Sequence, residues 1–394
     1  PPKVGMLNMV MDAAADLRPD RKVTVLPIAI SYEQIAEEKS YARELSGKKK
    51  KKESFSQLLR ATSVLKKRFG KVYMRIGEPL MLNETLENLP NHWSELPTDQ
   101  QKELLFELGE RVIYRIGQNM LVLPTGVTAL ALLSGHQLGM SVDELKARAL
   151  RYDTLLRKLG AQSVDSMRLG GWSIEQALDR FLKEKWIERI EDERSQVLRI
   201  LPNMRVTMEY YKNSLIHFVA PISMLSSAIL ANDGVCHGKV VLNDFLLQCF
   251  VLRYEFPGTP MSDLETIAIG ARKAMAEYGA LQLDGDSYSI DNHDLLLELA
   301  SLTHNFLESY LWTLKGSYLV RDREISQKNL PKKLQEIGQA RIATGELRRT
   351  EALSVINLSN AVRAFTEENV FSFRANGGIE FHSTVWEEYV SSFQ

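Results

Sequence analysis

The sequence predicts an α/β segment over residues 1–90, followed by a large and mainly α-helical region over residues 91–394. Near the start, a helical pattern leads into a nearly continuous apolar and β-branched run, which is the order of elements in α/β domains. Beyond about residue 100, long stretches of helical periodicity dominate. The 394 residues are 44% hydrophobic and 25% charged, which is enough apolar material for folded cores.

The first helix is expected over residues 5–17, and the first strand over residues 22–31 (KVTVLPIAIS). A continuous run of valine, leucine and isoleucine is typical of a central strand that is covered on both faces. Pro27 has no N–H group for a neighbouring strand, so it must lie at the strand end or at a bulge. The helix is supported by one apolar stripe, formed by Met6, Val10, Ala13 and Leu17.

Residues 33–53 are polar and end in five lysines at positions 48–52. Ser54 is expected to cap a helix that runs to about Arg68. A second strand follows over residues 71–76 and is ended by Gly-Glu-Pro at 77–79. We expect the α/β segment to close near Pro90.

The remaining region is expected to be a series of helices with short strands between them. A weak repeat is visible, because three stretches each run from a helix into a short polar hairpin, which is how winged-helix modules end. Generic helix-to-hairpin units are the alternative. Nucleic-acid binding is not expected, since this region is net acidic. The three stretches are residues 177–200, 271–290 and 361–381, and the expected helices are 99–121, 141–159, 173–190, 205–231, 261–279, 292–316 and 331–346.

The formal net charge of −1 conceals an asymmetry along the chain. Residues 1–90 hold 17 Lys and Arg against 11 Asp and Glu, a balance of +6, which leaves 32 against 39 in the remainder. Anionic partners are therefore expected at the basic end. Two cysteines are too few for a disulfide framework, which fits a reducing compartment, and the seven scattered histidines predict no metal site. Because residue 1 is Pro, we expect the chain to begin inside a longer protein.

Several short motifs resemble blocks of one known family. Residues 25–33 (VLPIAISYE) are similar to the fourth conserved block of the large bacterial glycerol-3-phosphate acyltransferases, and residues 76–79 (IGEP) resemble a strand end of the same enzymes. Residues 210–217 (YYKNSLIH) resemble a tyrosine-rich helix of their C-terminal part. Residues 2–7 look like the stretch that follows the family's arginine block, and residues 41–47 with 51–54 resemble the stretch after the fourth block. The resemblance implies that residues 1–90 are the remnant of an α/β acyltransferase domain.

The resemblance also implies an activity. Such an enzyme transfers a fatty acyl group from acyl-carrier protein or acyl-CoA to the sn-1 hydroxyl of glycerol 3-phosphate, needs no cofactor, and works on an anionic surface at the cytoplasmic face of the inner (cytoplasmic) membrane. In this family a His-x-x-x-x-Asp pair activates the attacking hydroxyl. None of the seven histidines here has Asp five positions later, so this chain alone is expected to be inactive. The alternatives are a dihydroxyacetone-phosphate acyltransferase and a non-catalytic regulatory or binding protein with winged-helix-like units.

The expected substrate-binding residues are Lys3, Pro27, Ser31 and Tyr32. Ligands in open α/β sheets gather beyond the carboxyl ends of strands, and the run through Pro27 would deliver Ser31 and Tyr32 there. An ordinary buried strand that ends in a tyrosine is the alternative. By resemblance, Lys3 would approach the phosphate from just beyond an arginine block, although a lone lysine is usually solvated.

Three further features have both a structural and a functional interpretation. The lysines at 48–52 are either a solvated loop or a contact with an anionic bilayer. Glu78 and Pro79 are expected to end a strand, and His217 to be a satisfied core histidine. The apolar run 215–231 is shorter than the roughly 20 residues that span a bilayer, which favours a buried helix.

Overall fold

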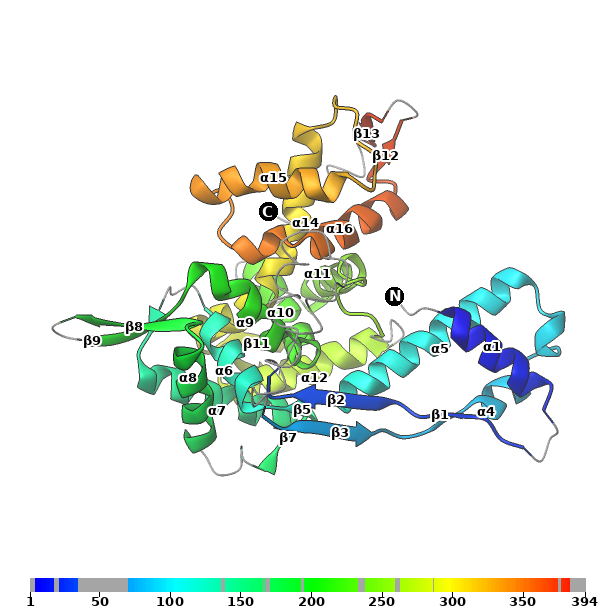
Figure 1. Cartoon of the computed structure of the whole chain (residues 1–394), viewed down its shortest axis with the longest axis horizontal. Coiled ribbons are helices and arrows are strands. Elements are labelled where there is room, and N and C mark those ends of the chain that lie inside the picture. The colour runs from blue at the N-terminus through cyan, green and yellow to red at the C-terminus, as the bar shows by residue number, and fades with distance from the viewer. Residues whose placement is uncertain are drawn as a thin grey trace, which may run out of the picture.

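Helices form most of the molecule, and the sheets are small (Figure 1). The structure is a computed structural model that describes residues 4–17, 21–34, 70–135, 139–165, 167, 171–192, 195–232, 238–258, 263–285, 287–374 and 377–382. The helix expected over residues 54–68, the lysines at 48–52 and Lys3 lie outside these ranges. In Figure 1, the last helices and the hairpin β12–β13 lie at the top, and the hairpin β8–β9 projects to the left.

In the described residues up to 118, the chain forms two short antiparallel ribbons, three α-helices and one 3₁₀ helix. β1 pairs with β4, and β2 pairs with β3. Their bounds are α1 Val4–Ala15, β1 Thr24–Val25, β2 Ile28–Tyr32, β3 Val72–Ile76, β4 Leu80–Met81, α4 Leu82–Glu87, η1 Trp93–Glu95 and α5 Thr98–Gln118.

The remainder is built of helices with short strands between them. The bounds are β5 Leu121–Val122, α6 Pro124–Leu133, β6 Gly139–Met140, α7 Val142–Lys158, β7 Gln162–Ser163, α8 Gly171–Lys183, β8 Ile187–Asp192, β9 Ser195–Ile200, η3 Pro202–Met204, α9 Arg205–Asn213, α10 Ile216–Ala231, α11 Gly238–Val251, α12 Leu264–Tyr278, β10 Leu281–Asp284, β11 Ser287–Ile290, α13 His293–Ala300, η5 Ser301–Thr303, α14 His304–Leu319, α15 Leu330–Ala343, η6 Thr350–Leu353, α16 Val355–Glu367, β12 Phe371–Phe373 and β13 Ile379–Phe381.

Two hydrophobic cores organise the described residues. The large core runs from β5 to β13 and centres on α10, most of whose side chains are buried. The small core joins α1, α4, η1 and α5, and Trp93 fills it while its indole N–H donates to Asp12 at 2.7 Å. This small core combines side chains from both sides of residue 90, the boundary expected from the sequence.

Three helix-to-hairpin units occupy the stretches in which the sequence shows its weak repeat: α8 with β8–β9, α12 with β10–β11, and α16 with β12–β13. In the first unit β6 joins the hairpin to give the order β6-β9-β8. The structure thus describes a helix followed by an antiparallel hairpin three times. The likeness to winged-helix modules stays a prediction.

The three units share one backbone geometry at the helix end. A residue with positive φ follows each helix: Lys185 (58°), Gly279 (88°) and Asn369 (54°). The backbone N–H of the residue after it donates to the carbonyl five residues earlier, as in a Schellman motif. These bonds join Trp186 to Phe181 (2.9 Å), Ala280 to Met275 (3.0 Å) and Val370 to Phe365 (2.9 Å). The carbonyls of Trp186, Ala280 and Val370 then accept an N–H from just beyond the second strand, donated by Leu201, Asp291 and His382. The repeat is therefore structural rather than a likeness of residues.

Two long helices expected from the sequence are broken. The stretch 205–231 forms α9 and α10, which bend by 102° at Ser214 and Leu215. The Ser214 hydroxyl donates to the Tyr211 carbonyl at 2.7 Å. Gly126 of α6 packs against this bend, and a Cβ on it would lie 3.0 Å from the Leu215 side chain. The stretch 292–316 likewise divides into α13, η5 and α14. Among the described residues no single helix is long and apolar enough to span a membrane, although the pair 202–213 and 216–231 passes that test when joined.

Candidate functional site

The hairpin β2–β3 presents an apolar face to solvent. Three directly opposed pairs form it, and we call these six side chains the open sheet face: Ile28 and Ile76, Ile30 and Met74, Tyr32 and Val72. Each of them is between 42% and 65% exposed. Large apolar side chains gathered on one surface are typical of a surface that another protein segment covers.

The opposite face of the hairpin is buried because side chains alternate along a strand. Ala29 is 1% exposed and Ser31 is 4% exposed, and β2 packs on α5 on this side. The prediction that the strand is covered on both faces was therefore wrong for the structure described here. A run of apolar residues does not show which face is covered. Within the described ranges, β2 and β3 form a two-stranded sheet without a strand on either side.

The structure places the expected site residues on different sides of the hairpin. The Ser31 hydroxyl accepts the Leu121 N–H at 3.1 Å, so it fixes β2 against the start of β5. The Tyr32 side chain lies on the open sheet face and is 44% exposed. Pro27 is buried and its carbonyl accepts the Gly77 N–H at 2.8 Å. Pro27, Ser31 and Tyr32 are close in the sequence, but in the described structure their side chains do not line one polar pocket.

Polar contacts fix one end of the hairpin. The Glu33 carboxylate accepts the Tyr73 hydroxyl at 3.1 Å and the Lys71 N–H at 3.0 Å. Burial, together with the charge of Glu33, raises the pKa of Tyr73 to about 12. Arg180 of α8 donates to Gln34 at 2.5 Å, so the hairpin end is tied to the first helix-to-hairpin unit.

The Gly-Glu-Pro turn fixes the other end to α5. Arg115 donates to the carbonyls of Glu78 and Pro79 at 3.0 and 3.1 Å. A Cβ on Gly77 would stand 2.4 Å from the Asn119 amide nitrogen, so a larger residue here would displace the Asn119 side chain. Glu78 and Pro79 thus hold the end of β3 against α5, which agrees with the expectation that they end a strand.

His217 is half-buried in α10, where its Nε2 lies 2.9 Å from the Gly117 carbonyl. Burial lowers the pKa of this imidazole to about 4. It also lines a cavity of about 480 Å³ beside Met224 and Cys249, and burial raises the pKa of the Cys249 thiol to about 12. An uncharged imidazole and an uncharged thiol fit a packing role for both side chains.

We expect His217 to make stability depend on pH. Because its folded-state pKa lies below the ordinary 6.5, the unfolded chain takes up the proton first, and stability falls as pH drops from about 6.5 toward about 4. At pH 5 the free energy of unfolding should therefore be about 2 kcal/mol lower than at neutral pH because of His217. Urea unfolding at pH 7 and pH 5 should show a smaller loss for His217→Gln than for the unchanged protein. An equal loss in both proteins would contradict the assignment.

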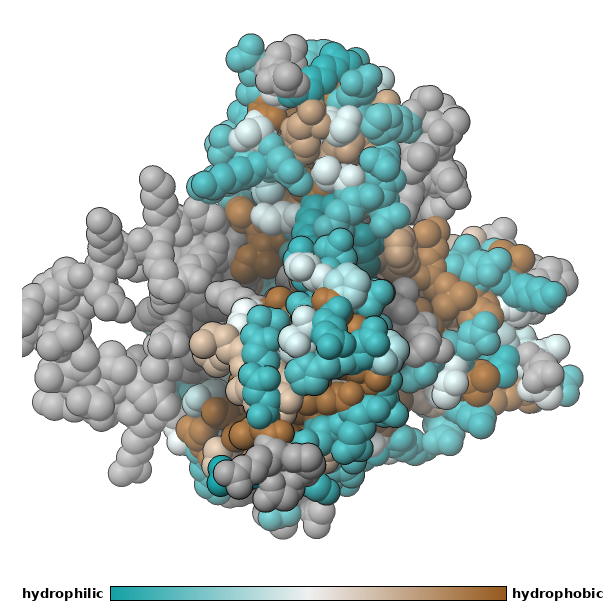
Figure 2. Space-filling model, turned by 90° about the vertical axis from the view of Figure 1, so that its right-hand side faces the viewer, coloured by the Kyte–Doolittle hydropathy of each residue, from teal (hydrophilic) through white to brown (hydrophobic). Residues whose placement is uncertain are grey.

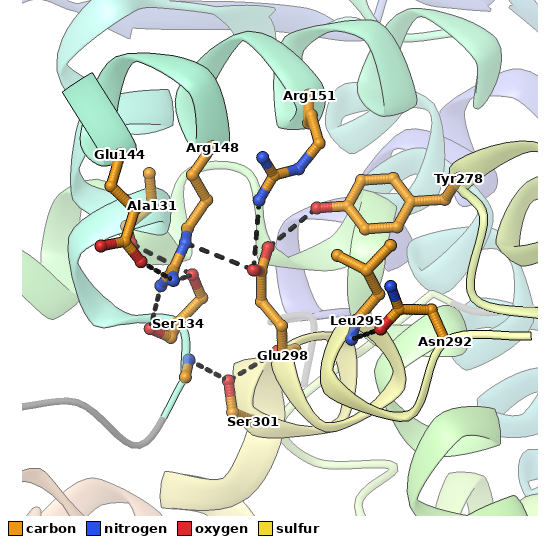
Figure 3. A network of polar contacts seen from close by, with 11 residues as sticks. Ala131, Ser134, Glu144, Arg148, Arg151, Tyr278, Asn292, Leu295, Glu298 and Ser301 are labelled. Atoms are coloured by element: carbon orange, nitrogen blue, oxygen red, sulfur yellow. Dashed lines mark hydrogen bonds and ion pairs between the residues drawn. The ribbon is translucent and has the colours of Figure 1, made fainter. Parts of the chain in front are cut away.

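Sequence reasoning missed several buried charged residues. Lys212 of α9 is 1% exposed, and Arg148 and Glu298 are each 7% exposed. Figure 3 shows Arg148 and Arg151 of α7 both pointing at Glu298 of α13, with the Tyr278 hydroxyl on its other oxygen. The sequence offered one signal for a buried lysine, since Lys212 directly follows two tyrosines. No group of three or more metal-ligating side chains occurs in the described ranges.

The chain is similar in sequence to one known protein family. Residues 41–374 match the family described as glycerol-3-phosphate acyltransferase C-terminal region. A relative from Pseudomonas syringae pv. syringae, named glycerol-3-phosphate acyltransferase, is 29% identical over 73% of this chain and 35% of its own length. Relatives with the same name from Aeromonas hydrophila subsp. hydrophila (29% identity, 61% of this chain, 30% of the relative) and Shewanella denitrificans (32%, 62% and 31%) are also similar. The chain thus spans well under half the length of these relatives, and it belongs to the family of glycerol-3-phosphate acyltransferase C-terminal regions.

Proposed function

We propose that this chain supplies the C-terminal region of an enzyme that acylates the sn-1 hydroxyl of glycerol 3-phosphate, with acyl-carrier protein or acyl-CoA as the donor. The observation that carries the proposal is the family match over residues 41–374. The names of the relatives support the acceptor and the type of reaction. The chain itself has no His-x-x-x-x-Asp pair to activate a hydroxyl.

The open sheet face supports a specific role for this chain in the longer enzyme. It presents three opposed apolar pairs on a strand that the resemblance assigns to an acyltransferase domain. The relatives have a large part of their length outside the matched region. We therefore assign the open sheet face as the surface on which that other part packs, so that Tyr32 lies where the two parts meet. Lys3 and Tyr32 keep their proposed place at the substrate, while the buried Pro27 and Ser31 would act by positioning the strand that carries Tyr32.

The proposed location is the cytoplasmic face of the inner membrane, on an anionic lipid surface. The +6 balance of residues 1–90 favours such a surface. Met6 and Met9 of α1 are 78% and 70% exposed, and they would enter the interfacial layer. Figure 2 views the side that carries α1, where hydrophobic patches interrupt the hydrophilic surface. We also propose that the chain does not bind nucleic acid. Its three helix-to-hairpin units are proposed to resemble winged-helix modules.

The activity is tested with the purified full-length protein and with this chain alone. The full-length protein is expected to acylate glycerol 3-phosphate at sn-1 with acyl-CoA or acylated carrier protein, while the 394-residue chain shows no turnover. Dihydroxyacetone phosphate assayed in parallel separates the alternative acceptor. Turnover by the chain above a control without protein, or none by the full-length protein, would contradict the proposal.

The role of the open sheet face is tested by Met74→Lys. In this chain alone the side chain is 65% exposed, so stability should change by no more than about 0.5 kcal/mol. In the full-length protein the lysine would be buried in an apolar contact, so Tm and activity should both fall clearly. Ile190→Lys on β8 is the matched control, since Ile190 is 40% exposed on a strand far from this face. A full-length Met74→Lys protein with unchanged Tm and activity would rule out the packing surface.

A further inference from the structure

The cavity of about 480 Å³ that His217 lines lies between α5, α10, α11 and α12. The stretch that follows α11 and one residue of α16, Arg363, complete its border. We call it the apolar cavity. Its volume is typical of small-molecule sites, and it shares no lining residue with the open sheet face.

The wall of the apolar cavity is suited to hydrocarbon. Cys249 Sγ lies 3.7 Å from Met224 Sδ, so α11 and α10 meet at this wall. The two titratable groups beside Met224, the His217 imidazole and the Cys249 thiol, are both uncharged at neutral pH. His217 Nε2 is already engaged by the Gly117 carbonyl. The apolar side chains of the wall are Ala220, Pro221, Met224, Phe256, Leu264 and Ile267.

The positive charges at the border of the apolar cavity are matched by carboxylates of the protein itself. Arg253 pairs with Glu367 at 3.3 Å and with Glu368 at 2.8 Å. Arg363 pairs with Glu367 at 2.8 Å. Both guanidinium groups also lie over the Tyr254 ring, 4.8 and 4.1 Å from its centre, so the ring is held between them. An anionic headgroup would have to compete with these partners for the two arginines.

One face of α5 leaves the border negative. Glu103, Glu107 and Glu110 are exposed lining residues, and their spacing places them on one side of the helix with Phe106. Phe106 is 42% exposed and continues the apolar wall outward. Because the two lining arginines are neutralised by other carboxylates, these three glutamates would repel an anionic headgroup.

We propose that the apolar cavity binds the single alkyl chain of an uncharged lipid, whose headgroup lies at the border beside Phe106. This ligand differs from glycerol 3-phosphate and from the acyl donors, which are anionic. α5 belongs to the small core, while α10 and α12 belong to the large core. A bound alkyl chain would therefore contact helices of both cores and hold them together.

The proposal is tested by calorimetric titration of the purified protein with 1-hexanol, 1-heptanol and 1-octanol. Each added methylene should tighten binding about fourfold, which is the effect of burying one CH₂ group. Octanoate at pH 8 has a negative headgroup on a chain of the same length, and it should bind about tenfold more weakly than 1-octanol.

Two variants alter the apolar wall. Ile267→Lys puts an ammonium group in the wall and should abolish binding of 1-octanol, while Phe106→Ser should weaken it about fivefold. Ile269→Lys on α12 and Tyr114→Ser on α5 are the matched controls. Ile269 is 47% exposed and Tyr114 is 37% exposed, and neither is a lining residue, so both controls should bind as the unchanged protein does.

A third variant tests the charge at the border. Replacing Glu103, Glu107 and Glu110 together by glutamine should bring the affinity for octanoate close to that for 1-octanol and leave 1-octanol binding unchanged. Urea unfolding shows which variants are folded, and Phe106→Ser keeps the test decisive if Ile267→Lys does not fold, since Phe106 is exposed.

The proposal would be overturned if 1-octanol shows no saturable binding or binds no more tightly than 1-hexanol. Octanoate that binds as tightly as 1-octanol to the unchanged protein would overturn it too. So would a folded Phe106→Ser or Ile267→Lys protein that binds 1-octanol as its matched control does.

Discussion

Replacing Lys212 by alanine is expected to lower the free energy of unfolding by about 3–5 kcal/mol, since it leaves a buried carboxylate without its counter-ion. Lys212 Nζ contacts three acceptors, Glu209 Oε2 at 2.8 Å and the Leu302 carbonyl and Asn305 Oδ1 at 3.0 Å each. An ammonium group has three N–H donors, so all of them are used. Burial lowers the pKa of Lys212 and raises that of Glu209, while the attraction between the two opposes both shifts. Urea unfolding followed by circular dichroism measures the loss.

A second pair of variants separates charge from packing. Lys212→Met keeps most of the side-chain volume, so it should remain strongly destabilising if the unpaired Glu209 carboxylate is the cause. Lys212→Met combined with Glu209→Leu removes both charges and should recover part of the loss, though not all, because Leu302 and Asn305 still lack a donor. If Lys212→Met alone costs less than about 1 kcal/mol, the ion pair behaves like a surface pair and the assignment is wrong.

The first strand shows what apolar composition can and cannot predict. Its existence follows from the run of β-branched residues, but the single strand expected over residues 22–31 divides around Pro27 into β1 (Thr24–Val25) and β2 (Ile28–Tyr32), which belong to different sheets. Its burial does not follow, since Ile28 and Ile30 are exposed in the structure although they belong to the most apolar part of the run. Composition reports that a strand is suited to burial, while the segment that covers it can lie elsewhere in the protein.

Helix positions were predicted better than helix ends. α5, α7 and α15 lie within a few residues of their expected ranges because long apolar periodicity is a strong signal. The break between α9 and α10 was missed, since Ser214 and Leu215 are compatible with a helix and the bend depends on α6 packing at that point. The helix expected over residues 173–190 ends at Lys183, because Lys185 takes a left-handed conformation that lysine seldom adopts.

The buried charges could not be predicted because lysine, arginine and glutamate normally indicate exposed positions. Besides Glu209 on the same helix as Lys212, the groups that surround Lys212 and Glu298 come from other elements. Those partners are distant in the sequence, as in the 90 residues between Lys212 and Leu302.

Glu298→Ala is expected to destabilise the protein by about 3–5 kcal/mol, because Glu298 is the shared partner of two arginines. Arg148 Nε and Arg151 Nη2 each lie 3.3 Å from Glu298 Oε2, and the Tyr278 hydroxyl donates to Oε1 at 2.8 Å (Figure 3). The Arg148 and Glu298 side chains are each only 8% exposed, so water replaces the lost carboxylate poorly at Arg148. Since these residues come from α7, α12 and α13, the loss should loosen the contact among three helices.

Arg148 supplies the matched control, because it has a second carboxylate partner in Glu144 at 2.8 Å, whose side chain is 38% exposed. Glu144→Gln should cost no more than about 1 kcal/mol, since solvent can reach that position. Glu298→Gln should fall between the two variants, as the amide keeps the shape and can still accept from Tyr278 while the two guanidinium groups lose their shared anion. Raised salt should weaken the Glu144 contribution more than that of Glu298. Equal losses for Glu144→Gln and Glu298→Ala would show that burial does not decide the strength of this network.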